Sequence, residues 1–284
     1  MVTRRLSLVG IAALTLVYGC SPVTVLNRLA RDDTYVRTPD VAFGGDAQLR
    51  LDIYQPRALP LRAPVVVFFY GGSWSSGERE QYLFVGEALA SRGIVTVIAD
   101  YRLYPQVRYP DFLRDCAAAV AWTFQNIEAY GGDPARIFVA GHSAGAYNAA
   151  MIALDERWLQ PFGLEPRRLA GLVGLAGPYN FLPIVDDDIK PIFNVPVAQP
   201  DSQPVAHVSG HAPPTLLLVA RGDRLVYPER NTEVLAREMR ERGDAVTVKT
   251  YGGVSHTTLI GAMARPLRSL APVLDDFSSF VLAH

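Results

Sequence analysis

The sequence predicts an α/β fold in which helices cover both faces of a mostly parallel β-sheet. Short runs of β-branched and aromatic residues alternate along the chain with longer stretches rich in helix-forming residues. Several of these runs are continuously apolar, as expected for strands buried on both faces. Near the middle of the chain, a sharp glycine-bounded turn joins one such run to a helical stretch. Strands that alternate with helices in this way are typical of parallel sheets.

Seven strands are expected. The first, Leu49–Tyr54, alternates between apolar and polar residues, as an edge strand with one face in solvent should. The others follow in chain order as Pro64–Tyr70, Ile94–Ala99, Arg136–Ala140, Ala170–Ala176, Thr215–Ala220 and Ala245–Thr250.

Helices are expected between and after these strands. One of them begins at Pro228 and ends before Gly243, in keeping with the preference of proline for helix starts and glycine for helix ends. The expected helices are Tyr82–Arg92, Asp111–Tyr130, Ala144–Asp155, Pro228–Glu241 and much of Ala264–Ala283. The absence of internal repeats and low-complexity tracts indicates a single domain over residues 46–284.

A proline-rich segment at about residues 177–214 interrupts the alternation of strands and helices. Irregular segments of this length in a compact domain are usually functional or disordered. The segment contains the acidic run Asp186–Asp188, whose consecutive side chains diverge. A solvated face is therefore favoured over a metal site.

The first twenty residues have the character of an export signal. Arg4 and Arg5 precede the apolar run Leu6–Val17, which is too short for a stable transmembrane helix. The run leads to Gly19-Cys20, which resembles a bacterial lipobox, where the cysteine becomes the lipidated N-terminal residue. We therefore expect a lipoprotein-type signal peptide over residues 1–19, lipidation at Cys20 and a tether over residues 20–45. An ordinary secreted form or an uncleaved anchor is the alternative.

Localisation to the cell envelope follows from this interpretation. Ser21 does not resemble an inner-membrane retention signal, which favours the outer membrane or its periplasmic face. If Cys20 carries lipid, only Cys116 remains, so no intramolecular disulfide can form. Cys116 lies in an apolar helical stretch and is expected to be a small buried residue and not a nucleophile. The net charge of −1 and the lack of like-charge blocks argue against a nucleic-acid partner.

Ser143 is the candidate nucleophile. It lies at the centre of Gly141-His-Ser-Ala-Gly145, after an expected strand and before an expected helix. This is the context of a nucleophile elbow, in which the serine occupies a strained turn and glycines relieve crowding on either side. The pentapeptide alone would occur by chance in about one chain in ten of this length, so its neighbours carry the assignment.

His256 is the candidate base, since a serine hydroxyl needs an adjacent imidazole to remove its proton. It follows the last expected strand and is expected on a loop at the carboxyl end of the sheet, where catalytic groups gather in open α/β sheets. His142 adjoins Ser143, but its side chain is expected to point elsewhere. The remaining histidines lie in the proline-rich segment or at the chain end, and are His207, His211 and His284.

Asp223 is the candidate acid that would hold the tautomer of His256. It follows the expected strand Thr215–Ala220, and is favoured over Glu229 and Asp186–Asp188. Main-chain N–H groups must stabilise the oxyanion of the tetrahedral intermediate. The expected donors are Ala144, directly after the nucleophile, and Gly72 and Ser73, in the loop after a buried strand.

At these residues the chain resembles the α/β-hydrolase superfamily, and within it bacterial carboxylesterases near the hormone-sensitive-lipase and kynurenine-formamidase branches. The resemblance runs from about residue 48 to residue 275. It departs from the family at Tyr70, where these branches usually have histidine, and at Ser73, where many members have a third glycine. The matching segments are Phe69–Trp74, Ala99–Leu103, Gly131–Phe138, Gly141–Gly145, and Asp223 with His256.

The resemblance implies an α/β-hydrolase fold in which residues 177–214 form a short cap over the site. It also implies that Asp100 and Arg102 brace the oxyanion loop. The expected activity is hydrolysis of small carboxylic esters through an acyl-enzyme, with no metal or organic cofactor. An amidase, arylformamidase or peptidase with the same residues remains an alternative. A non-catalytic binding protein is disfavoured because Ser143, Asp223 and His256 are all present.

Overall fold

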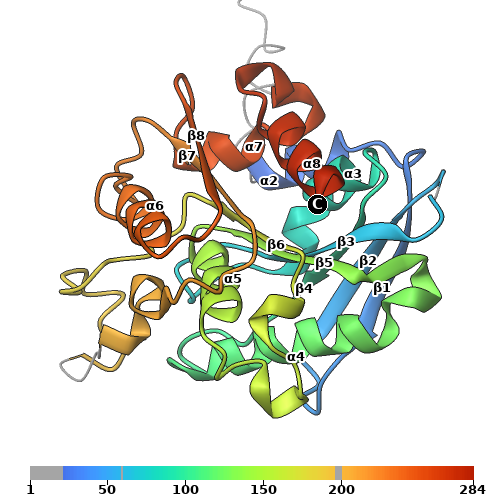
Figure 1. Cartoon of the computed structure of the whole chain (residues 1–284). Helices are drawn as coiled ribbons and strands as arrows, with labels where there is room; N and C mark the ends of the chain where they lie inside the picture. The colour runs from blue at the N-terminus through green and yellow to red at the C-terminus, as the bar shows by residue number, and fades with distance from the viewer. Residues whose placement is uncertain (1–21, 59, 196–199) are drawn as a thin grey trace, which may run out of the picture.

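The structure is a computed structural model that describes residues 22–58, 60–195 and 200–284 (Figure 1). Eight strands form one sheet in the order β1-β2-β4-β3-β5-β6-β7-β8. The first two strands pair antiparallel, and all pairs from β4 to β8 are parallel. The strands are β1 (Tyr35–Ala42), β2 (Arg50–Pro56), β3 (Ala63–Phe69), β4 (Val95–Ala99), β5 (Gly132–His142), β6 (Gly171–Leu175), β7 (Thr215–Ala220) and β8 (Val246–Tyr251).

Helices cover both faces of this sheet, so the predicted fold class is confirmed. One apolar cluster lies under α4 (Asp111–Asn126), α5 (Ala144–Leu154) and α6 (Thr232–Glu241). The opposite face is covered by α3 (Leu83–Ala90), α7 (His256–Gly261) and α8 (Val273–Ala283), as Figure 1 shows, and a second apolar cluster lies beneath these helices. The remaining helices are α2 (Pro22–Arg28) and the short 3-10 turns η1 (Arg79–Tyr82), η2 (Ile127–Tyr130), η3 (Gln160–Phe162), η4 (Pro166–Arg168), η5 (Pro200–Ser202), η6 (Pro204–His207) and η7 (Arg265–Leu270).

The last two predicted helices are shorter than expected. Helix α6 begins at Thr232 and not at Pro228, since the residues before it form a turn. The helix expected within Ala264–Ala283 is divided into η7 and α8, with Pro272 at the N-terminal cap of α8. Proline has no N–H to continue a helical hydrogen-bond ladder, which accounts for the break.

The N-terminal boundary of the domain differs from the prediction. Residues 20–45 were expected to be a tether, but β1 pairs with β2 from Tyr35 opposite Pro56 to Ala42 opposite Arg50. Helix α2 precedes it and also belongs to the folded unit, since Leu26 packs against the second apolar cluster. Part of the expected tether is therefore part of the domain.

The prediction that Leu49–Tyr54 forms an edge strand is wrong for the same reason. Strand β2 lies between β1 and β4, and its residue Asp52 is fully buried. The carboxylate of Asp52 pairs with Arg37 of β1 at 2.6 Å and with Arg79 of η1 at 3.1 Å. Asp52, which suggested a solvent-facing strand, is thus the buried carboxylate of an ion-pair cluster.

Cys116 is fully buried within α4, as the sequence predicted, and burial raises the pKa of its thiol. The signal peptide predicted over residues 1–19 and the lipidation site Cys20 lie outside the described residues. Across the part of the chain that the structure describes, each helix is too short or too polar to cross a bilayer.

Substitution of Arg79 by methionine is expected to lower the free energy of unfolding by about 3 kcal/mol or more, because it leaves the buried carboxylate of Asp52 incompletely compensated. The Arg79 side chain is 11% exposed. The matched control is Arg62→Met, since Arg62 is 61% exposed and pairs with Asp133 at the surface. That change should cost under about 1 kcal/mol. Urea unfolding measures both, and equal losses would contradict this account of Asp52.

Candidate active site

Ser143 occupies a strained turn between β5 and α5, with φ 56° and ψ −123°. Positive φ is rare for a residue with a side chain and is often found at functional sites. Close packing on both sides enforces the turn. A Cβ atom on Gly145 would lie 2.0 Å from the carbonyl oxygen of Phe69, and one on Gly141 would lie 2.3 Å from the main chain of Gly145. Both glycines flanking Ser143 are therefore required by backbone contact.

Asp223 and His256 form a hydrogen bond of 2.7 Å between Oδ2 and Nδ1. Because a carboxylate only accepts, Nδ1 of His256 carries the proton and Nε2 presents its lone pair. The second carboxylate oxygen of Asp223 accepts from the main-chain N–H groups of Leu225 and Val226, at 2.9 and 3.0 Å. Burial raises the pKa of Asp223, but the hydrogen bonds from His256 and the main chain outweigh burial and leave the pKa below its usual value.

His256 is the first residue of α7 and not a loop residue as predicted. Ser255 caps the helix, since its side chain accepts from the N–H of Thr258 while its own N–H donates to Thr258 Oγ1 at 2.7 Å. The sequence did contain this signal, because Ser-His-Thr-Thr carries a serine and a hydroxyl-bearing residue at the spacing of a capping box. The cap fixes the main chain from which the imidazole projects.

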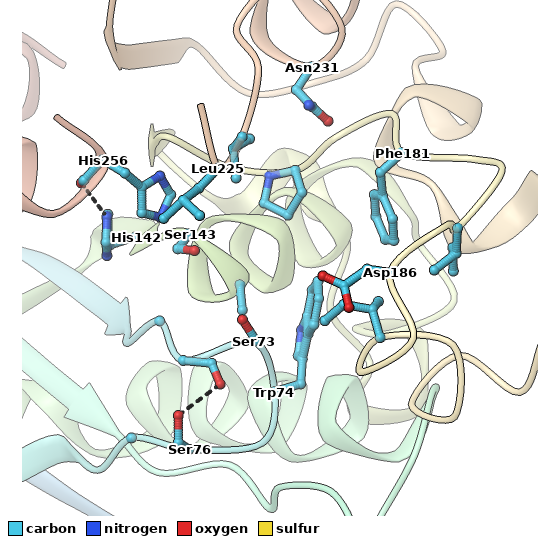
Figure 2. Close-up of a pocket in the computed structure, with 18 of the residues that line it drawn as sticks. Ser73, Trp74, Ser76, His142, Ser143, Phe181, Asp186, Leu225, Asn231 and His256 are labelled. Carbon is cyan, nitrogen blue, oxygen red and sulfur yellow. Dashed lines mark hydrogen bonds between the residues drawn. The ribbon is translucent and has the colours of Figure 1, made fainter. Parts of the chain in front are cut away.

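Ser143 and His256 line one cavity of about 640 Å³, together with Gly72, Ser73 and Ala144 (Figure 2). The structure thus brings the predicted nucleophile, the predicted base and all three predicted oxyanion donors to the same cavity. Asp223 contacts the base and is not part of the cavity lining.

The loop after β3 presents its main chain to this cavity. Three consecutive residues have positive φ, namely Gly72 (129°), Ser73 (50°) and Trp74 (53°). Within the described residues, the N–H groups of Gly72 and Ser73 donate to no protein acceptor. Ala144 is the first residue of α5, so its N–H also has no partner inside the helix. These three N–H groups are available to an oxyanion.

Tyrosines support this loop. One of them, Tyr70, stands where the branches that the chain resembles usually have a histidine. Tyr101 donates its hydroxyl to the carbonyl of Tyr70 at 2.8 Å, and the two rings stack with centroids 4.6 Å apart. The N–H of Gly71 donates to the hydroxyl of Tyr82 at 3.1 Å. Asp100 and Arg102 lie nearby in structural ion pairs, Asp100 with Arg79 and Arg102 with Asp115 of α4.

Sequence reasoning missed the environment of Trp74. Its indole N–H donates to Asn148 of α5 at 3.0 Å, which ties the oxyanion loop to the helix after Ser143. The indole also packs among four aromatic rings. They are Phe112, Tyr147, Phe181 and Phe193.

His142 was also missed, since its side chain was expected to point away from the site. It lies beside His256, with ring centroids 4.8 Å apart, and Nε2 lies 3.1 Å from the main-chain oxygen of His256 (Figure 2). Burial, with a smaller contribution from His256, lowers the pKa of His142 to about 3. No sequence signal marks this contact, because the elbow pattern leaves the position before the serine unspecified.

The cap segment lines one side of the cavity. The side chains of Phe181, Ile184 and Ile189 contribute apolar surface, and Asp186 contributes a carboxylate. Over its described residues, 177–195 and 200–214, the segment contains short 3-10 turns and no α-helix.

Two of the other candidates, His142 and Asp186, line the same cavity as His256, and the remaining ones lie elsewhere. Asp187 pairs with Lys190 at the surface, and Glu229 is exposed and lines a different groove. His207 contacts the carbonyl of Asp201 at 2.7 Å and lines a second hollow with His211. Among the residues with described positions, His, Cys, Asp and Glu side chains form no group of three suited to a metal ion.

Comparison with known proteins gives consistent matches. The sequence profile of the BD-FAE family matches residues 51–239. The chain is 30% identical over 242 residues to Esterase LipC of Mycobacterium tuberculosis, covering 78% of this chain and 59% of that protein. It is 35% identical over 150 residues to isoprenylcysteine alpha-carbonyl methylesterase ICME of Arabidopsis thaliana, covering 51% of this chain and 35% of that protein.

Among solved structures, an esterase of Pyrobaculum calidifontis superposes with a TM-score of 0.76 at 23% identity, covering 98% of both chains. The structural likeness shows that the fold is that of α/β-hydrolases. The chain spans less than two thirds of the length of curated relatives such as LipC and ICME.

Replacement of His142 by glutamine is expected to make stability less sensitive to acid. Below about pH 6.5 an unfolded histidine binds a proton, whereas folded His142 resists protonation until about pH 3. The free energy of unfolding of the wild-type protein should therefore fall by up to about 1.4 kcal/mol per pH unit because of this residue, as the pH falls through that interval. Urea unfolding between pH 7.5 and 4.5 measures the difference. Parallel stability curves for the two proteins would contradict a buried neutral His142.

Proposed function

Because the chain belongs to the BD-FAE family, we propose that it is a serine hydrolase that cleaves carboxylic esters through an acyl-enzyme on Ser143. One observation carries the proposal. A single cavity holds a serine on a strained elbow, a histidine whose tautomer is set by Asp223, and main-chain donors with no protein acceptor. The esterases among its relatives and structural neighbours support the same reaction class.

The reaction follows from the tautomer of His256. Its Nε2 accepts the hydroxyl proton of Ser143 as Oγ attacks the ester carbonyl, and Asp223 stabilises the resulting imidazolium. The carbonyl oxygen becomes an oxyanion and accepts hydrogen bonds from the N–H groups of Gly72, Ser73 and Ala144.

The acyl-enzyme then forms and breaks by proton transfers through the same imidazole. The tetrahedral intermediate collapses as His256 protonates the departing alkoxide, leaving the acyl group on Ser143. His256 next takes a proton from water, and the hydroxide attacks the acyl carbonyl. Collapse of the second intermediate releases the acid and returns the proton to Ser143.

The cavity lining supports esters with an apolar acyl or alcohol group. Trp74 and Phe181 provide aromatic surface on one side (Figure 2). Ile184 and Ile189 also line the cavity. Leu225, from the loop that carries Asp223, also lines the cavity. A volume of about 640 Å³ suits small or extended substrates.

The N-terminal sequence supports a further proposal, that the protein is exported and anchored by a lipid on Cys20. The basic pair Arg4-Arg5, the apolar run and Gly19-Cys20 are its only support. The first described helix, α2, starts at Pro22, close to this cysteine, so the anchor would hold the enzyme near the membrane surface.

Ser143→Ala is expected to lower kcat/KM for p-nitrophenyl butyrate by a factor of about 10⁴ or more, since the nucleophile is removed. Asp223→Asn should lower it by about 10²- to 10⁴-fold, because the amide can select the wrong tautomer of His256. Ser209→Ala, at an exposed serine outside the cavity, is the matched control and should retain wild-type activity. Hydrolysis that survives Ser143→Ala would refute the serine mechanism. Amide turnover without ester turnover would point to the amidase alternative.

Cys20→Ser is expected to move the protein from the membrane fraction to the soluble fraction, because the residue that accepts the lipid is lost. The measurement is fractionation of expressing bacteria, with palmitate labelling of the wild type. The control is Cys116→Ser, which should stay in the membrane fraction because Cys116 is buried inside α4. Wild-type protein that carries no label would refute lipidation at this cysteine.

A further inference from the structure

We propose that His142 is a positioning residue, which holds His256 in place to receive the proton of Ser143 by donating a hydrogen bond to its main-chain oxygen. The inference rests on the proposed serine mechanism and adds a residue to it. On this proposal, His142, the residue before the nucleophile, helps to hold the base His256.

The direction of the hydrogen bond is set by its acceptor. Nε2 of His142 lies 3.1 Å from the carbonyl oxygen of His256, and a carbonyl oxygen can only accept. Nε2 therefore carries the proton of the imidazole. Burial lowers the pKa of His142 to about 3, so its ring stays neutral at neutral pH and adds no positive charge beside the base.

The second ring nitrogen of His142, Nδ1, has different surroundings from Nε2. Nδ1 is buried and has no hydrogen-bond partner among the described residues, while the side chain is 6% exposed. A buried acceptor without a hydrogen-bond partner is destabilising. An apolar side chain would avoid that cost. Among the described residues, the hydrogen bond that this polar ring does make is the one to the main-chain oxygen of His256.

The contact joins the two halves of the site. His142 is the last residue of β5 and directly precedes Ser143, whose turn is fixed by glycine packing. His256 is the first residue of α7. Asp223 holds the ring of His256 by a hydrogen bond, and the Ser255 cap holds the main chain before it. His142 binds the main-chain oxygen of His256. Freed from this last constraint, α7 could shift, and a displacement of about 1 Å can cost about 100-fold in rate.

The oxyanion loop also lies close to His142. A Cβ atom on Gly71 would lie 3.2 Å from Nδ1 of His142 and 3.1 Å from Cβ of Ser143. The ring of His142 therefore lies close both to the loop that provides the oxyanion donors and to the first residue of the helix that provides the base. A substitution of His142 changes both the volume of the side chain and its Nε2–H donor. The experiment therefore has to separate the loss of the donor from the change in volume.

The test compares His142→Gln, His142→Leu and the wild type. Glutamine can place an N–H near the position of Nε2, whereas leucine fills part of the volume and has no donor. We expect the leucine variant to lose about 10- to 100-fold in kcat for p-nitrophenyl butyrate with KM within about twofold. The glutamine variant should recover most of that loss. The matched control is Thr123→Val, which replaces a fully buried polar residue in α4 and should leave kcat unchanged.

Wild-type kcat in the leucine variant, or equal losses in the leucine and glutamine variants, would overturn the proposal. A second readout is the rate at which a p-nitrophenyl phosphonate labels Ser143. In this reaction Oγ binds phosphorus and p-nitrophenolate leaves, so it needs the serine and the histidine but no hydrolysis of a carboxylic ester. The same ranking of variants is expected. If the wild type is labelled without hydrolysing esters, ester hydrolysis is wrong while the ranking still tests His142. If Ser143 is not labelled at all, both proposals fail.

Discussion

The close packing of main chain around Ser143 is the constraint on which the rest of the site depends. The Cα of Gly145 presses so closely on the end of β3 that an added Cβ would lie 2.0 Å from the carbonyl of Phe69 and 2.5 Å from that of Tyr70. The oxyanion loop begins at the next residue. One contact therefore sets both the strained turn of Ser143 and the position of Gly71 to Trp74 relative to it. Positive φ at Ser143, Ser73 and Trp74 is maintained by this packing and by the hydrogen bond of Trp74 to α5.

Parallel strands supply the second half of the site. Strands β7 and β8 end at the same edge of the sheet as β3 and β5, so the segments that follow them meet there. Asp223 follows β7 and His256 follows β8, and the 2.7 Å hydrogen bond between them fixes the tautomer that a proton acceptor needs. The contact of His142 with the carbonyl of His256 links this half to the elbow. The catalytic geometry is thus distributed over strand ends that one sheet holds in register.

Much of the fold and most of the candidate site could be predicted because their signals are local. Gly141 and Gly145 mark the elbow by their spacing, and Asp223 and His256 follow recognisable strands in order. The edge strand was mistaken because Asp52 looks like a solvent-facing residue in sequence, and only tertiary structure brings Arg37 and Arg79 to it. β1 was missed for a related reason, since its residues are only half-buried and show no clear period. The role inferred for His142 depends on a contact with a residue 114 positions away, which no local pattern encodes.

The most direct test of the serine mechanism is to trap the acyl-enzyme. Purified protein would be mixed with p-nitrophenyl butyrate, quenched in acid during turnover, and measured by intact and peptide mass spectrometry. The account predicts one butyryl group per molecule, on the peptide that contains Ser143, and its absence when the reaction has gone to completion. A butyryl group on another residue would contradict it.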